Sequence, residues 1–149
     1  MRNKGLSLVM ALAGFFFLFG ATVYAADCPA GIKMDNKAYA AHKKGIVDFS
    51  HQKHYTDYKI GCGECHHDAT GKPLATLKEG DAVQGCIECH KKPAKAKAKK
   101  GEKLTMAQKM EYHADAVHEN CISCHKDFNK KNNTKAAPTT CAKCHPKVN

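Results

Sequence analysis

Apolar residues are grouped in only two places along this chain. Residues 6–19 form a mostly apolar run without charge, and residues 105–120 carry apolar side chains three or four positions apart. That second spacing predicts an amphipathic helix. Thr105 and Gln108 form a capping-box pattern, so we expect the helix to begin there. The apolar positions of this predicted helix are Met106, Met110, Ala114 and Val117.

The rest of the chain is polar and rich in turn signals. Residues 27–48 predict an extended lead-in, and residues 68–85 predict a loop with a turn at Gly71–Pro73. Residues 126–140 predict a polar loop. The segment 91–103 carries seven lysines in thirteen residues. It is interpreted either as a solvated loop or as a docking surface for acidic partners.

The first 25 residues have the pattern of an export signal. Arg2 and Lys4 precede the apolar run, and Val23-Tyr24-Ala25 resembles a small-residue cleavage site. We therefore expect a signal peptide over 1–25, a lead-in over 26–45 and one domain over 46–149. An uncleaved membrane anchor is the alternative, although the run is short for a bilayer span.

The chain is poor in the residues that build a hydrophobic core. It has no Trp, and 24 of its 149 residues are Lys or Arg. A soluble domain of this size and composition buries too little apolar surface to offset its conformational entropy. A large apolar group other than protein side chains is therefore expected to supply the core.

A five-residue motif, Cys-x-x-Cys-His, occurs four times and uses eight of the nine cysteines. This is the attachment pattern of c-type haem, in which the two thiols bind the porphyrin and the His ligates the iron. It predicts four covalently bound haem c groups. The attachment cysteines would be Cys62, Cys65, Cys86, Cys89, Cys121, Cys124, Cys141 and Cys144, and the proximal iron ligands His66, His90, His125 and His145.

Three other interpretations of the cysteines leave the repeated His unexplained. Two Cys pairs could share a structural zinc ion. A single pair could act as a thioredoxin-like redox site, but that site is normally found in a βαβ unit, and no such pattern is present. A disulfide framework suits a small exported chain, and it also ignores the four histidines.

Further histidines lie close to the motifs and suit a second axial position on each iron. His51, His54 and His67 flank the first motif. His67 follows the proximal His66 directly and points another way, so it should serve a different haem. The fourth distal ligand is His118 or His113, with His118 favoured because it stands three residues before Cys121. His42 is expected to be exposed.

These predictions give one fold class. We expect a small single domain, mostly irregular with some α structure, wrapped around four c-type haems with few short helices and little sheet. Without haem the chain should be largely unfolded. The formal charge of +10 is offset by haem propionates, which argues against a nucleic-acid binder.

The motifs together resemble the class III cytochrome c family, the tetrahaem cytochromes c3. Phe49-Ser50-His51-Gln52-Lys53-His54 is similar to that family's Phe-x-His-x-x-His, and Cys62 to His67 is similar to its first motif with a doubled His. The resemblance implies that Phe49 packs against the haem cluster. It also implies that His51 ligates haem 1, His67 haem 2, His54 haem 3 and His118 haem 4.

The resemblance implies a periplasmic, low-potential electron carrier and not an enzyme, with no catalytic residues. Its expected partners are a periplasmic hydrogenase or formate dehydrogenase and membrane-bound redox complexes of anaerobic respiration, including sulfate respiration. Two alternatives remain open. One is a multihaem reductase of metals or oxyanions, and the other is a cytochrome wire subunit joined by a disulfide through Cys28.

Overall fold

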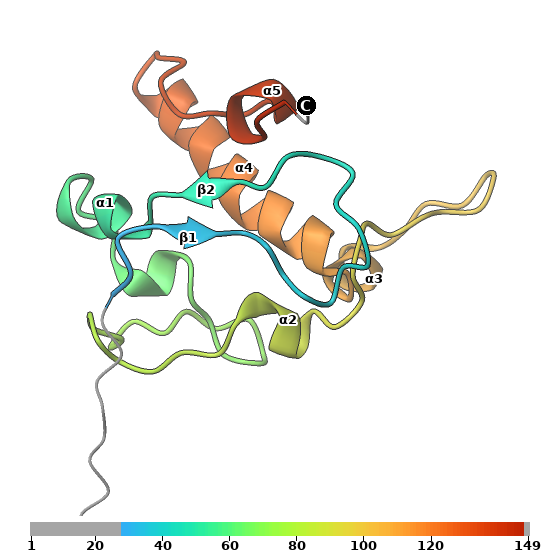
Figure 1. Ribbon diagram of the computed structural model, residues 1–149, viewed down its shortest axis with the longest axis horizontal. Coiled ribbons are helices and arrows are strands. Elements are labelled where there is room, and N and C mark those ends of the chain that lie inside the picture. The colour runs from blue at the N-terminus through green and yellow to red at the C-terminus, as the bar shows by residue number, and fades with distance from the viewer. Residues whose placement is uncertain (1–27, 148–149) are drawn as a thin grey trace, which may run out of the picture.

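The computed structural model describes residues 28–147 (Figure 1). The expected signal peptide over 1–25 lies outside the described residues. Most of the described chain has no regular structure, which confirms the expected fold class of short helices with little sheet. The elements in chain order are β1 (Ile32–Lys33), β2 (Asp48–Phe49), α1 (His51–Thr56), a 3₁₀ helix (Cys62–Glu64), α2 (Cys86–Cys89), α3 (Met106–Met110), α4 (His113–Lys131) and α5 (Cys141–Cys144).

Helix α4 is the longest element, and α2 and α3 both pack against it. The start of the predicted helix is confirmed, because Thr105 caps α3 and forms a complete capping box with Gln108. A single helix over 105–120 is wrong, however. The chain breaks at Tyr112, whose backbone is extended, and α4 begins at His113.

The break is caused by pairing with a distant segment. Tyr112 forms isolated bridges with Lys91 and Lys92. Lys92 N–H donates to the Glu111 carbonyl at 3.0 Å, and His113 N–H donates to the Lys92 carbonyl at 2.8 Å. These bonds fix an extended residue where local sequence favours a helix, as tertiary context often does.

The polar loop predicted over 126–140 is also wrong for its first part, because α4 runs on to Lys131. The sequence contains no Gly or Pro between positions 102 and 137, so nothing local stops the helix after the third haem motif. It ends where Asn133 adopts a left-handed conformation (φ 48°), which Asn tolerates better than most residues.

Two short strands tie the lead-in to the rest of the domain. β1 and β2 pair antiparallel, with Ile32 opposite Phe49. Two residues before β1 begins, the Ala30 carbonyl accepts a 3.3 Å bond from Gln52 N–H in α1. Residues 28–33 are therefore held against the histidine-bearing helix α1, as Figure 1 shows.

Side-chain packing between these elements is sparse. Ala116, 8% exposed, is the one buried hydrophobic residue in the part of the chain that the structure describes. The polypeptide alone thus has almost no hydrophobic core, in line with the composition. Within residues 28–147, no helix is long and apolar enough to cross a membrane.

Candidate haem sites

Each Cys-x-x-Cys-His motif forms one helical turn. In three motifs the backbone N–H of the His donates to the carbonyl of the first Cys, at 2.9 Å in His66 and His90 and 2.8 Å in His145. The third motif lies inside α4. Since residues three apart lie on one side of a helical turn, both thiols of a pair face the same way. The motif therefore presents two thiols and an imidazole together.

An extended residue precedes each of the three short motif helices. Gly61, Gly85 and Thr140 have ψ values of 150°, 150° and 153°. The chain thus enters these turns from an irregular segment. The structure places seven of the eight motif cysteines within four separate elements, which are the 3₁₀ helix, α2, α4 and α5, and Cys65 directly follows the 3₁₀ helix.

Every predicted distal histidine faces one motif histidine. The ring centroids of His51 and His66 are 6.2 Å apart, and those of His67 and His90 are 5.9 Å apart. In the other two pairs, His54 lies 6.2 Å from His125, and His118 lies 6.1 Å from His145. The neighbours His51 and His54 on α1 therefore face two different motifs.

The separation within each pair matches two imidazoles that share one metal ion. A metal–imidazole bond is about 2.0 Å long, so two rings on opposite sides of one ion have centroids about 6 Å apart. A cleft of about 490 Å³ also opens beside Cys62, bordered by Tyr55, Leu77 and Glu79 among others. The residues present therefore fit haem groups held between paired histidines.

The second ring nitrogen of most paired histidines is held by the protein. Nδ1 of His125 donates to the Pro138 carbonyl at 2.7 Å, and Nδ1 of His145 donates to the Gly45 carbonyl at 2.8 Å. Such bonds fix the tautomer that leaves Nε2 free for a metal. The other carbonyl acceptors are Ser50 for His54, Asp68 for His67, Met110 for His90 and Ala114 for His118.

The two remaining histidines meet at Tyr39 and face no motif histidine. The Tyr39 hydroxyl lies 2.9 Å from Nδ1 of His113, and the Tyr39 ring stacks on His42 with 5.3 Å between centroids. His42 also contacts Asp35 at 2.9 Å and is exposed, as predicted. Of the two candidates for the fourth distal position, the structure brings His118 and not His113 to a motif.

Phe49 lies between two of the predicted distal ligands. Its ring centroid is 5.7 Å from that of His51 and 4.9 Å from that of His54. Phe49 is held in this position by β2, because Ile32 pairs with it from β1. The ring therefore fills the space between two candidate iron ligands.

All nine cysteines are free of disulfides, so the eight motif thiols are available for attachment. Burial, followed by the nearby thiols of Cys65 and Cys86, raises the pKa of the Cys121 thiol to about 11. Among residues 28–147, no group of three or more His, Cys, Asp or Glu side chains is arranged to hold a bare metal ion.

Comparison with protein families decides between the remaining interpretations. Residues 28–145 match the class III cytochrome c family. The chain belongs to that family. The match begins at Cys28, so the matched region includes the lead-in segment that carries β1. Comparison with curated proteins and with solved structures gave no match.

Membership of the class III cytochromes c implies covalently bound haem c and multihaem electron transfer, and members are electron carriers. The four histidine pairs give this cytochrome a physical basis for such a role, since each pair can hold one iron from both sides.

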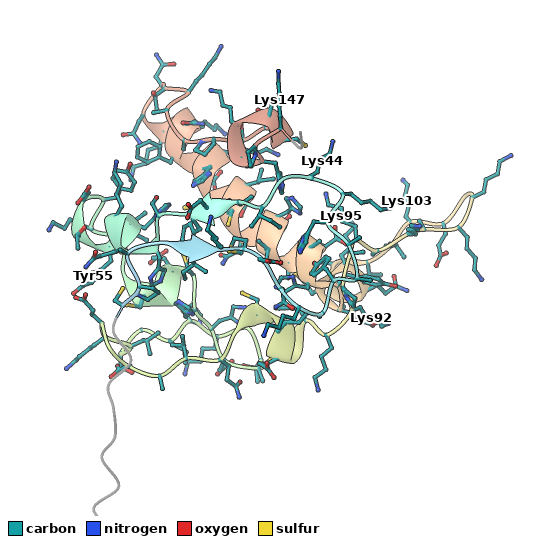
Figure 2. All side chains as sticks on the ribbon, in the orientation of Figure 1. Lys44, Tyr55, Lys92, Lys95, Lys103 and Lys147 are labelled. Carbon is teal, nitrogen blue, oxygen red and sulfur yellow. The ribbon has the colours of Figure 1, made fainter. Side chains whose placement is uncertain are left out.

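The segment 91–103, which we call the lysine arm, projects from the body of the molecule (Figure 1). Its base is fixed to α4 and to the end of α3, because Ala96 N–H donates to the Asp115 carboxylate of α4 at 2.7 Å and Lys92 pairs with Glu111, which caps α3. Its tip turns at Gly101, whose φ is +85°. All seven of its lysines are exposed, and Figure 2 shows Lys95 and Lys103 on it.

Several residues that hold the site were not predicted from the sequence. The backbone carbonyls of Gly45 and Pro138 and the side chain of Cys28 contact paired histidines that lie 100, 13 and 23 positions away in the chain. Carbonyl groups are present at every position, so no residue type marks those that accept a bond. Cys28 was noticeable only as the cysteine left over from four complete motifs.

Proposed function

We propose that this protein is a periplasmic tetrahaem electron carrier in which each haem is held by one cysteine pair and two histidines. The supporting observation is the set of four histidine pairs, each with ring centroids about 6 Å apart, the distance expected for two imidazoles on one metal ion. The proposed axial pairs are His66 with His51 (haem 1), His90 with His67 (haem 2), His125 with His54 (haem 3) and His145 with His118 (haem 4).

Haem bound at these sites would supply one-electron chemistry, at a lower potential with two imidazoles than with a His/Met pair. The two histidines of each pair would hold the iron from both sides and leave no place for a substrate on it. That arrangement favours a carrier over a metal or oxyanion reductase. The carbonyl groups that accept from Nδ1 keep each ring oriented and raise its basicity.

We further propose that the carrier works between soluble and membrane-bound redox enzymes in the periplasm. The signal pattern over 1–25 supports export. The exposed lysine arm supports docking to an acidic surface, because such charges mainly increase association rates. A periplasmic hydrogenase or formate dehydrogenase and a membrane redox complex of anaerobic respiration fit this role.

The decisive experiment combines mass spectrometry with low-temperature EPR on the purified protein. The mass should exceed that of the cleaved chain by four haem masses, and every ferric signal should be low-spin. A smaller number of haems would contradict the tetrahaem proposal. A high-spin ferric signal that rapidly binds cyanide or nitrite would instead support a reductase.

A further inference from the structure

Cys28 is the one cysteine outside the four motifs, and its thiol contacts a candidate iron ligand. Cys28 Sγ lies 3.3 Å from Nδ1 of His51. The six other Nδ1 atoms held in the paired histidines all donate to backbone carbonyls. Of these seven Nδ1 contacts, the one at His51, the proposed distal ligand of haem 1, is made by a side chain and not by the backbone. Its partner atom is sulfur and not oxygen.

The fold holds Cys28 in this place. The Ala30 carbonyl binds Gln52 N–H in α1 at 3.3 Å, and β1 pairs with β2 two residues further on. These bonds anchor the segment that carries Cys28 to the helix that carries His51. Cys28 and His51 also line a small pocket together with Cys62 and His66, the attachment and proximal residues of the same site.

The direction of the hydrogen bond follows from the role of His51. If Nε2 of His51 ligates iron, the ring proton is on Nδ1, so Nδ1 donates and the sulfur accepts. Sulfur is a weak acceptor. The thiol therefore forms a weaker hydrogen bond with the Nδ1 proton than a carbonyl would. This bond still orients the ring and increases the basicity of the imidazole.

We propose that Cys28 is a positioning residue for His51 and that its thiol helps to set the reduction potential of haem 1. This inference rests on the proposed function, because it requires His51 to be an axial ligand. The proposed role of Cys28 is thus neither haem attachment nor an intermolecular disulfide.

The test is a redox titration of the holoprotein with Cys28→Ala, followed by optical spectra and EPR. Loss of the acceptor should make His51 a poorer donor to ferric iron and raise the potential of one haem while three stay fixed. Outer-shell partners typically change metal affinity by about 10- to 100-fold. A roughly tenfold shift in that haem's redox equilibrium corresponds to about 59 mV for one electron.

Two variants distinguish the hydrogen bond from general loosening of the segment. Cys28→Ser keeps an acceptor and should return the potential toward that of the parent. Pro29→Ala changes the neighbouring residue but keeps the thiol, so it should leave all four potentials in place. An equal shift in Pro29→Ala, or four unchanged potentials in Cys28→Ala, would overturn the proposal.

Alkylation of the parent holoprotein gives a second measurement that requires no variant to fold. Once eight cysteines are in thioether bonds, N-ethylmaleimide can label only Cys28. Labelling should raise the same single potential, and the Cys28→Ser protein should not respond to the reagent. A labelled parent with unchanged potentials would contradict the inference. Four low-spin haems in the unmodified parent would show that the proposed function itself still stands.

Discussion

At the scale of single residues, each paired histidine uses its two nitrogens for separate tasks. Nε2 is left free toward the facing ring, while Nδ1 is held by the protein in seven of the eight paired histidines described. The pairing therefore depends on the groups that hold Nδ1 and fix each ring, as much as on the histidine ligands themselves.

His118 and His113 offer a direct test of the proposed haem 4 ligand. His118→Met should raise one midpoint potential by on the order of 100 mV, because a thioether ligand favours ferrous iron more than an imidazole does. His113→Met should leave all four potentials unchanged, since His113 faces Tyr39. Potentiometric titration with EPR checks both variants. A shift in His113→Met alone would transfer the ligand role to His113.

His113 should also make stability depend on pH. Burial, followed by the charge of His90, lowers the pKa of His113 below its ordinary value of 6.5. The unfolded chain then binds a proton that the folded chain resists, so the free energy of unfolding falls as pH drops below about 6.5. Thermal unfolding should be measured between about pH 7.5 and 5, the range in which His titrates. Over this range the parent should lose more stability than His113→Gln. Parallel curves would contradict the prediction.

The histidine roles could be predicted partly from short spacings and partly from the family resemblance. Spacing indicated that His67 serves a different haem from His66, and the resemblance implied the same of His51 and His54. The structure places each distal histidine opposite a different motif histidine. Tyr39 and Gly45 could not be predicted, because their partners His113 and His145 lie about 70 and 100 positions away and local pattern carries no information on them.

At the scale of elements, the position of α5 depends on a glycine. A Cβ on Gly45 would lie 2.3 Å from the Pro146 carbonyl oxygen, so the backbone there would have to move. The same glycine supplies the carbonyl that holds His145. The loop before β2 and the C-terminal motif are thus in close contact only because position 45 lacks a side chain.

Gly45→Ala should lower the free energy of unfolding by about 1–3 kcal/mol, the usual cost of overpacking. It should also disturb one haem signal, that of the His118–His145 site. Gly31→Ala is the matched control, because its Cβ would make only ordinary contacts, the nearest 3.4 Å from Asp48 Oδ1, and it should change stability by less than about 0.5 kcal/mol. Denaturant unfolding with EPR measures both effects. Equal losses in the two variants would contradict the steric explanation.

The elements show where sequence patterns are reliable. The capping box at Thr105 depends on residues three apart and was predicted correctly. The break at Tyr112 depends on Lys91 and Lys92, about 20 positions earlier in the chain, and was not predicted. The continuation of α4 past residue 126 was missed because its polar residues were taken as loop, although none of them stops a helix.

At the scale of the whole molecule, positive charge is spread along one edge. In Figure 2 the labelled lysines extend from Lys147, next to α5, through Lys44 to Lys103 on the lysine arm. The base of the arm lies near the proposed haem 4 site, because Ala96 N–H donates to Asp115, which stands about one turn before His118 on α4. A partner attracted to the arm would thus approach one haem site.

Changing Lys95, Lys97, Lys99 and Lys100 to Gln should slow reduction by an acidic redox partner at low salt. The difference from the parent should shrink as salt rises, because exposed charges are screened over about 8 Å at physiological ionic strength. The control changes Lys126, Lys130, Lys131 and Lys135 to Gln, which removes equal charge elsewhere. Stopped-flow rates measure both, and equal slowing would show that only net charge matters.

With iron bound between them, the proposed histidine pairs would also act as reversible cross-links that close loops of chain. His51 and His66 are about 15 residues apart, whereas His54 and His125 are about 70 apart, so closing the longer loop restricts the unfolded chain by about 1.4 kcal/mol more. That longer loop contains the whole His67–His90 loop and overlaps the other two. His54→Ala should therefore reduce the unfolding temperature more than His51→Ala, as calorimetry of the two holoproteins would show. The reverse order would mean that local packing, and not chain entropy, dominates. In the proposed export to the periplasm, the short loops near the N-terminus could close while the rest of the chain is still emerging, and the ring from His54 to His125 would close only after α4 has arrived.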